Sequence, residues 1–120
     1  MTISHEYLEF IIDQLAPLGR LSTRRMFGSV GIYCDGLMFA LLETDQQFFI
    51  KVDDVTRSRF EDAGFSRFTY QAKGKEISLS YYAVPESMID NQDELLLWAR
   101  LGVDAALRAP VKKTVRARRQ

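Results

Sequence analysis

The first apolar pattern along the chain has a helical period. Between residues 7 and 18, apolar side chains recur at three- and four-residue intervals, and the acidic side chains lie mostly off that stripe. Ser4 is a residue type that caps helix N-termini, and Pro17 and Gly19 should end the helix. The pattern predicts an amphipathic helix that lies against a sheet.

From Met26 the period changes to two. One face of the predicted strand carries Met26, Gly28, Val30, Ile32 and Cys34, and the other carries Phe27, Ser29, Gly31 and Tyr33. Asp35-Gly36 then forms a strong hairpin signal, because both residue types tolerate the positive φ of a type I′ turn. Residues 37 to 42 should return antiparallel, and a turn near residues 44 and 45 should lead to a third strand over residues 47 to 52.

A short second helix and a second hairpin are expected next. Asp53 or Asp54 should cap a helix that ends at Gly64. Residues 65 to 72 and 76 to 84 read as two strands joined through residues 73 to 75. In the later strand the predicted buried face carries Ile77, Leu79, Tyr81 and Ala83, and the wetter face carries Glu76, Ser78, Ser80 and Tyr82.

The last predicted element is a helix. Pro85 stops the preceding strand, and residues 85 to 89 read as a helical turn. Asn91 and Glu94 have the spacing of a capping box ahead of an apolar run, and Pro110 should end the helix near Ala109. The fold class is therefore α+β, a two-layer arrangement in the order α-β-β-β-α-β-β-α, with helices packed on an antiparallel sheet.

Charge divides the chain into two parts. The total is zero, with 16 cations and 16 acids, but from Arg108 onward there are six cations and no acid. The predicted domain spans residues 1–109, and residues 110–120 form a basic tail that is too polar to pack and is expected to be disordered. The tail cations that could contact phosphate or a partner are Lys112, Lys113, Arg116, Arg118 and Arg119.

The residues offer no catalytic or metal-binding constellation. Cys34 is the single cysteine and reads as a buried structural thiol, and His5 is the single histidine and reads as a surface residue. An internal disulfide, a serine–histidine triad and a multi-histidine metal site are excluded, so no cofactor or metal is expected. The acidic pairs read as helix caps or solvated faces: Asp53-Asp54, Glu61-Asp62 and Asp93-Glu94.

Arg24 and Arg25 are the remaining candidate contacts for phosphate or for a partner carboxylate, with solvated loop charges as the plainer interpretation. The spacing of Gly28 and Gly31 matches the loop by which KH domains clamp nucleic acid. A strand-like context argues against that loop, and paired glycines in a strand more often mark a bulge or a close backbone approach. The first residues lack a signal peptide, and no apolar run is long enough for a membrane span, so a cytoplasmic protein is expected.

Several separated motifs together resemble one family. They are Arg-Arg-Met-Phe-Gly-Ser-Val-Gly-Ile-Tyr at residues 24–33, Asp-Gly-Leu-Met-Phe-Ala at 35–40, Lys-Val-Asp-Asp at 51–54, Phe-Thr-Tyr at 68–70, Ser-Tyr-Tyr at 80–82 and Leu-Leu-Trp-Ala-Arg at 96–100. In this order they resemble the N-terminal domain of the TfoX/Sxy competence regulators over about residues 5 to 109. The resemblance implies an α+β fold like that of type III secretion chaperones, pairing as a homodimer, and regulation of DNA-uptake genes together with a cyclic-AMP receptor protein.

The leading functional hypothesis is therefore a non-enzymatic, cytoplasmic regulatory domain that binds a protein partner, which the resemblance connects to the transcription machinery. An alternative is a nucleic-acid accessory protein whose basic tail makes nonspecific phosphate contacts. A third reading, an enzyme or a binder of a small anionic ligand at Arg24 and Arg25, has the least support from the residues.

Overall fold

A computed structural model describes residues 4–26, 28–43, 47–72 and 75–109, with the backbone alone for residues 26, 68–72 and 75–79. Its strands are β1 (Leu21–Met26), β2 (Ser29–Cys34), β3 (Leu37–Leu42), β4 (Phe48–Lys51), β5 (Ser66–Ala72) and β6 (Lys75–Ala83). Its helices are α1 (His5–Leu15), the 3-10 turn η1 (Ala16–Leu18), α2 (Arg57–Asp62), α3 (Glu86–Ile89) and α4 (Gln92–Arg108).

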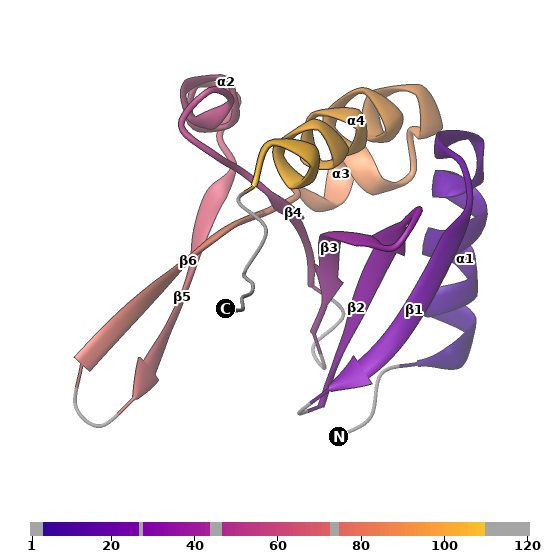
Figure 1. Cartoon of the computed structure of the whole chain (residues 1–120), viewed down its shortest axis with the longest axis horizontal. Coiled ribbons are helices and arrows are strands. Elements are labelled where there is room, and N and C mark those ends of the chain that lie inside the picture. Colours follow the sequence, from indigo (N-terminus) through magenta and orange to yellow (C-terminus); the bar gives the residue numbers. More distant parts are fainter. Residues whose placement is uncertain (1–3, 27, 44–46, 73–74, 110–120) are drawn as a thin grey trace, which may run out of the picture.

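The strands form one antiparallel sheet in the order β1-β2-β3-β4-β6-β5. Helices α1, α3 and α4 lie on one side of the first four strands, and the β5–β6 hairpin extends away from this body (Figure 1). The α+β class and the antiparallel sheet packed by helices are confirmed. The structure has one strand more than expected, because Leu21–Met26 forms β1.

The core lies between the sheet and α4, which crosses β3 and β4. Ile11 and Leu15 from α1 and Leu95 and Ala99 from α4 are buried against side chains of the inner strands. At Gly102 the helix comes so close to the sheet that an added Cβ would lie 2.5 Å from Ile50 Cγ2 and 3.2 Å from the carbonyl oxygen of Phe39. A glycine at this point allows the close helix–sheet contact.

The turn and cap predictions can be checked residue by residue. Asp35 and Gly36 have φ angles of 52° and 86°, which confirms the hairpin turn between β2 and β3. Ser4 Oγ accepts a hydrogen bond from the Tyr7 amide at 3.3 Å. Asn91 Oδ1 accepts one from the Glu94 amide at 3.2 Å. These contacts confirm the two predicted N-caps.

Three expectations are wrong in detail. Gly28 has a φ of 83° and lies in the turn between β1 and β2, not within a strand. Helix α2 begins at Arg57, after Thr56, because Asp53 Oδ1 accepts the amides of Val55 and Thr56 in a turn that precedes the helix. Tyr82, assigned to the wetter face of its strand, is buried. The predicted turn at residues 44 and 45 and the tail at 110–120 lie outside the described residues.

Candidate functional site

Arg24 and Arg25 lie in the edge strand β1 and not in a loop. They pair opposite Gly31 and Val30 of β2, and both side chains are exposed. Neighbouring residues of a strand point to opposite faces of the sheet, so the two guanidinium groups leave β1 in different directions. This placement does not bring them together around one anion. The five candidate cations of the tail lie outside the described residues.

The clearest charged contact joins the end of α4 to the turn before α2. Arg108 Nε donates to Asp53 Oδ2 at 2.7 Å, and Arg108 Nη2 donates to Asp53 Oδ1 at 3.0 Å. The hydrogen bonds from Arg108 hold the pKa of the Asp53 carboxyl below its ordinary value. Arg108, counted with the tail cations from the sequence, is therefore a paired residue of the domain.

A second polar cluster connects α2 to the β5–β6 hairpin. The buried Tyr82 hydroxyl donates to Glu61 Oε2 at 2.6 Å and accepts a hydrogen bond from Arg67 Nη2 at 3.2 Å. The hydrogen bond to Tyr82 raises the pKa of Arg67, and the nearby Glu61 carboxylate adds to this. Sequence reasoning missed this cluster because its three members are far apart in the chain and because Tyr82 was placed on the wrong face.

The isolated reactive residue types take structural positions. Cys34 is free and buried, and burial, with Asp35 nearby, raises the pKa of its thiol. His5 lies at the exposed start of α1, with its Nε2 3.1 Å from Glu9 Oε2. Both placements agree with the sequence interpretation of a structural thiol and a surface histidine.

Tyr81 of β6 pairs opposite Lys51 of β4, on the face of the sheet away from Tyr82 and the helices. Burial raises the pKa of Tyr81 to about 12, with a further contribution from Tyr33. Lys51 Nζ lies 5.4 Å from the centre of the Tyr81 ring, within the range of a cation–π contact. The alternation of β6 had predicted Tyr81 on the buried face, but its side chain is only partly buried and Tyr82 is the buried one. Lys51 and Tyr33 come from other strands and left no signal in the sequence.

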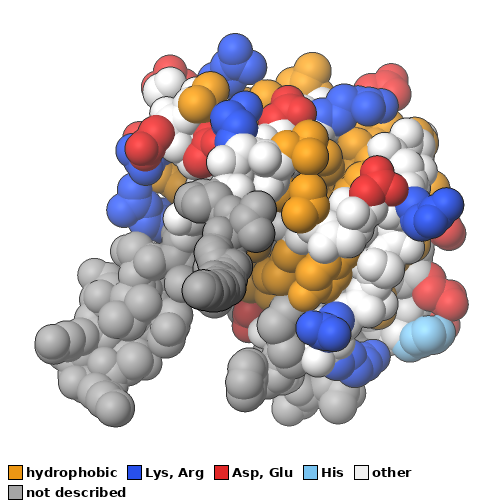
Figure 2. Space-filling view, in the orientation of Figure 1, with side chains coloured by type: hydrophobic (Ala, Val, Ile, Leu, Met, Phe, Trp, Pro, Cys, Tyr) orange, Lys and Arg blue, Asp and Glu red, His pale blue; other side chains and the backbone are white. Residues whose placement is uncertain are grey.

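The described residues do not converge on a reaction centre. Within them there is no group of three or more histidine, cysteine, aspartate or glutamate side chains that could hold a metal ion. None of the described helices is long and apolar enough to cross a membrane. On the face shown in Figure 2, basic and acidic side chains of the described residues are interspersed and form no patch of one sign.

The comparisons with known proteins point to one family. The TfoX N-terminal domain profile matches residues 13–106. The chain is 28% identical over 106 residues to Protein Sxy of Escherichia coli (strain K12), an overlap covering 88% of this chain and 50% of that protein. It is 32% identical over 78 residues to DNA transformation protein TfoX1 of Aliivibrio fischeri (strain ATCC 700601 / ES114), covering 65% of this chain and 37% of that protein. The chain thus spans half or less of each of these relatives, and it belongs to the TfoX N-terminal domain family.

Proposed function

We propose that this chain is a non-enzymatic regulatory domain that acts in the cytoplasm by binding a protein partner, in a pathway of DNA transformation. The observation that carries the proposal is its membership of a family that includes a DNA transformation protein. The arrangement of the described polar residues supports it. Asp53 and Glu61 each take part in a hydrogen-bonded contact between elements of the fold, and Cys34 lies buried.

A chimera tests the regulatory role directly. The part of TfoX1 that aligns with this chain is replaced by residues 1–109, and the chimera is expressed in Aliivibrio fischeri that lacks TfoX1. We expect the chimera to restore DNA transformation well above the level of the deletion strain. A chimera that accumulates to the normal level, as measured by immunoblot, but restores no transformation would overturn the proposal.

We also propose that the domain pairs as a homodimer, as the resemblance implies. Light scattering over a range of protein concentrations measures the mass in solution. A mass of two chains supports pairing, and the mass of one chain, 13.8 kDa, at all concentrations overturns it.

A further inference from the structure

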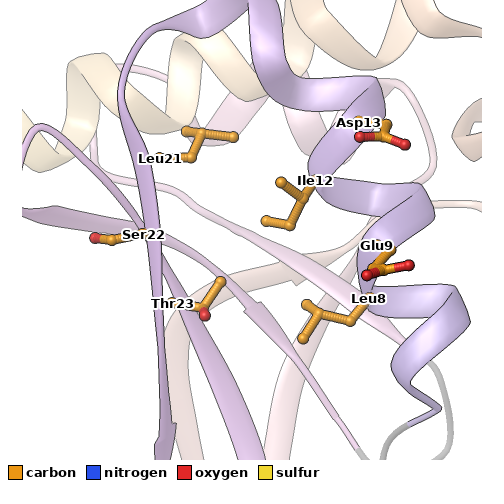
Figure 3. Close-up of a pocket in the computed structure, with 7 residues that line it drawn as sticks. All are labelled: Leu8, Glu9, Ile12, Asp13, Leu21, Ser22 and Thr23. Atoms are coloured by element: carbon orange, nitrogen blue, oxygen red, sulfur yellow. The ribbon is translucent and has the colours of Figure 1, made fainter.

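The open edge of the sheet at β1 adjoins a groove. Among the residues that the structure describes, β1 is hydrogen-bonded to β2 along one edge and forms the end strand of the sheet. Beside it, the α1–β1 groove has a volume of about 500 Å³ and is lined by Leu8, Glu9, Ile12, Asp13, Leu21, Ser22 and Thr23. Figure 3 shows Leu8, Ile12 and Leu21 projecting into the space between α1 and β1, with Glu9 and Asp13 along the helix.

We propose that the α1–β1 groove binds an extended peptide that adds to β1 as a further strand and places a basic side chain beside Glu9 and Asp13. This inference rests on the proposed role in protein binding and names the surface and the kind of partner. An added strand hydrogen-bonds to the open edge of β1 through its backbone, and alternate side chains enter the groove.

The chemistry of the groove specifies the side chains of the peptide. Leu21 and Thr23 pair with core-facing residues of β2, so they lie on the helix side of the sheet. An added strand would place alternate side chains on that same side, next to Leu8 and Ile12. Apolar side chains of the peptide would pack there. A lysine between them could lay its methylene groups along Leu8 and Ile12 and bring its ammonium group to the carboxylates of α1.

The charge along β1 sets where the basic side chain goes. Glu9 and Asp13 are exposed and lie beside the first half of β1, at Leu21 to Thr23. Among the described residues, only His5 lies within ion-pair distance of Glu9, and no basic side chain lies within that distance of Asp13. Arg24 and Arg25 occupy the second half of β1 and would repel a cation there.

A single peptide suits this edge better than a second copy of the chain. Two β1 strands paired antiparallel would bring two α1 helices to the same side of the joined sheet, beside the same pair of strands. Paired strands are about 4.8 Å apart, whereas packed helices need about 8–10 Å between their axes. A single extended peptide brings no helix of its own to this space.

The test measures binding of the labelled, acetylated and amidated peptide Thr-Val-Thr-Lys-Thr-Val-Thr by fluorescence anisotropy, with backbone amide shifts from NMR to locate the site. A matched peptide carries glutamate in place of lysine. Two further peptides carry N-methyl groups on one or the other alternate set of residues. We expect saturable binding of the lysine peptide, weaker binding of the glutamate peptide, shifts in β1 and α1, and loss of binding on N-methylation of one set only.

Two matched variants test the charge contact. Asp13→Asn should weaken binding of the lysine peptide by up to about fivefold, the range of an exposed ion pair. Asp62→Asn, an exposed helical aspartate on α2, should leave it unchanged. Four results would each overturn the proposal. The lysine and glutamate peptides could bind equally, or the amide shifts could lie outside β1 and α1. N-methylation could leave binding unchanged, or the Asp13→Asn variant could bind as the parent does.

Self-association gives a separate outcome. Amide shifts in β1 that grow with protein concentration in the absence of peptide would assign the edge to a second copy and overturn the peptide proposal. If the TfoX1 chimera fails but the peptide shows saturable, lysine-dependent binding, the regulatory role alone is overturned. An active chimera without peptide binding would overturn this surface alone.

Discussion

Arg108 and Asp53 are 55 residues apart in sequence and are joined by two hydrogen bonds, of 2.7 and 3.0 Å. The same Asp53 carboxylate accepts the backbone amides of Val55 and Thr56. One side chain therefore both shapes the turn before α2 and holds the last turn of α4 against it.

Substitutions at Asp53 and Arg108 should separate the two roles of Asp53, in the turn before α2 and in the ion pair with Arg108. Asp53→Ala removes the acceptor for the turn amides as well as the ion pair, and we expect a loss of about 1 kcal/mol in the free energy of unfolding, mostly from the turn. Arg108→Gln removes the ion pair alone and should cost less, because the pair is partly exposed. Urea denaturation of both variants measures the difference. An Arg108→Gln variant less stable than Asp53→Ala would contradict this division of roles.

The Asp53 pKa also predicts an effect of pH. Because the folded-state pKa lies below the ordinary value of 3.8, the contribution of the contact to stability is complete above that pH. It is lost as the pH falls through the lower, folded-state pKa. The parent should therefore lose more stability on acidification than Asp53→Asn, as measured by thermal unfolding over an acid pH series. Identical pH profiles for the two proteins would show that the titration of Asp53 does not contribute to the loss of stability in acid.

Gly102 should tolerate no side chain without adjustment of the core. An added Cβ meets Ile50 Cγ2 at 2.5 Å, and overpacking of this kind costs about 1–3 kcal/mol. The higher helix propensity of alanine offsets up to about 1 kcal/mol of this cost. Gly102→Ala should therefore lower the free energy of unfolding slightly, and Gly102→Val should lower it more. Urea denaturation measures both, with Arg100→Ala on the exposed side of α4 as the control.

A double mutant tests whether Ile50 is the obstacle to a side chain at residue 102. The destabilisation caused by Ile50→Ala should be smaller in the Gly102→Ala background than in the parent, because the two changes relieve one another. Additive losses would mean that the contact with the Phe39 carbonyl, or another one, limits the packing instead.

Tyr82 should contribute stability through its hydroxyl group. Tyr82→Phe keeps the buried ring but removes the hydrogen bonds to Glu61 and Arg67. The side chains of Glu61 and Arg67 are about half exposed, so in this variant they can hydrogen-bond to water instead. We therefore expect a loss near 1 kcal/mol in the free energy of unfolding, below the range for hydrogen bonds to fully buried charged groups. Urea denaturation measures this loss, and Glu61→Gln should cost less, because the glutamine carbonyl oxygen can still accept from the Tyr82 hydroxyl and the Arg67 contact is kept. A Tyr82→Phe variant as stable as the parent would show that the hydroxyl contributes nothing net.

The sequence predicted most elements because their patterns are local. The amphipathic period of α1, the Asp35-Gly36 turn and the Asn91 cap each depend on residues a few positions apart. β1 was missed for a physical reason. As an edge strand it has one partner strand, and Ser22 to Arg25 are exposed, so the alternation that marks a half-buried strand is absent.

The contacts of the candidate sites were harder to predict because they join distant segments. The Asp53–Arg108 pair and the Glu61–Tyr82–Arg67 cluster depend on how α4 and the β5–β6 hairpin are placed on the body. The α1–β1 groove depends on an edge strand that has no clear pattern of its own. In each case the residue types were visible in the sequence, but their partners were set by the tertiary fold.

Cys34 should react slowly in the folded protein. Burial raises the pKa of its thiol, which keeps the reactive thiolate scarce near neutral pH and also limits access of reagents. Labelling with a chromogenic disulfide reagent should be slow in buffer and rapid in denaturant, and its rate should rise with pH. Rapid, complete labelling of the native protein would contradict the assignment of Cys34 as a structural thiol.

The basic tail should account for any nonspecific binding of nucleic acid. With Arg108 paired to Asp53, five cations remain from residue 110 onward, and each phosphate contact of a basic side chain should add about 0.9 to the slope of log affinity against log salt for duplex DNA. Deleting residues 110–120 should therefore lower affinity for a random-sequence duplex and flatten its salt dependence. The control, Arg24→Gln with Arg25→Gln, should have a smaller effect, because these residues point to opposite faces of β1. If the deletion leaves both affinity and slope unchanged while the control reduces them, the contacts belong to the edge strand and the tail hypothesis is wrong.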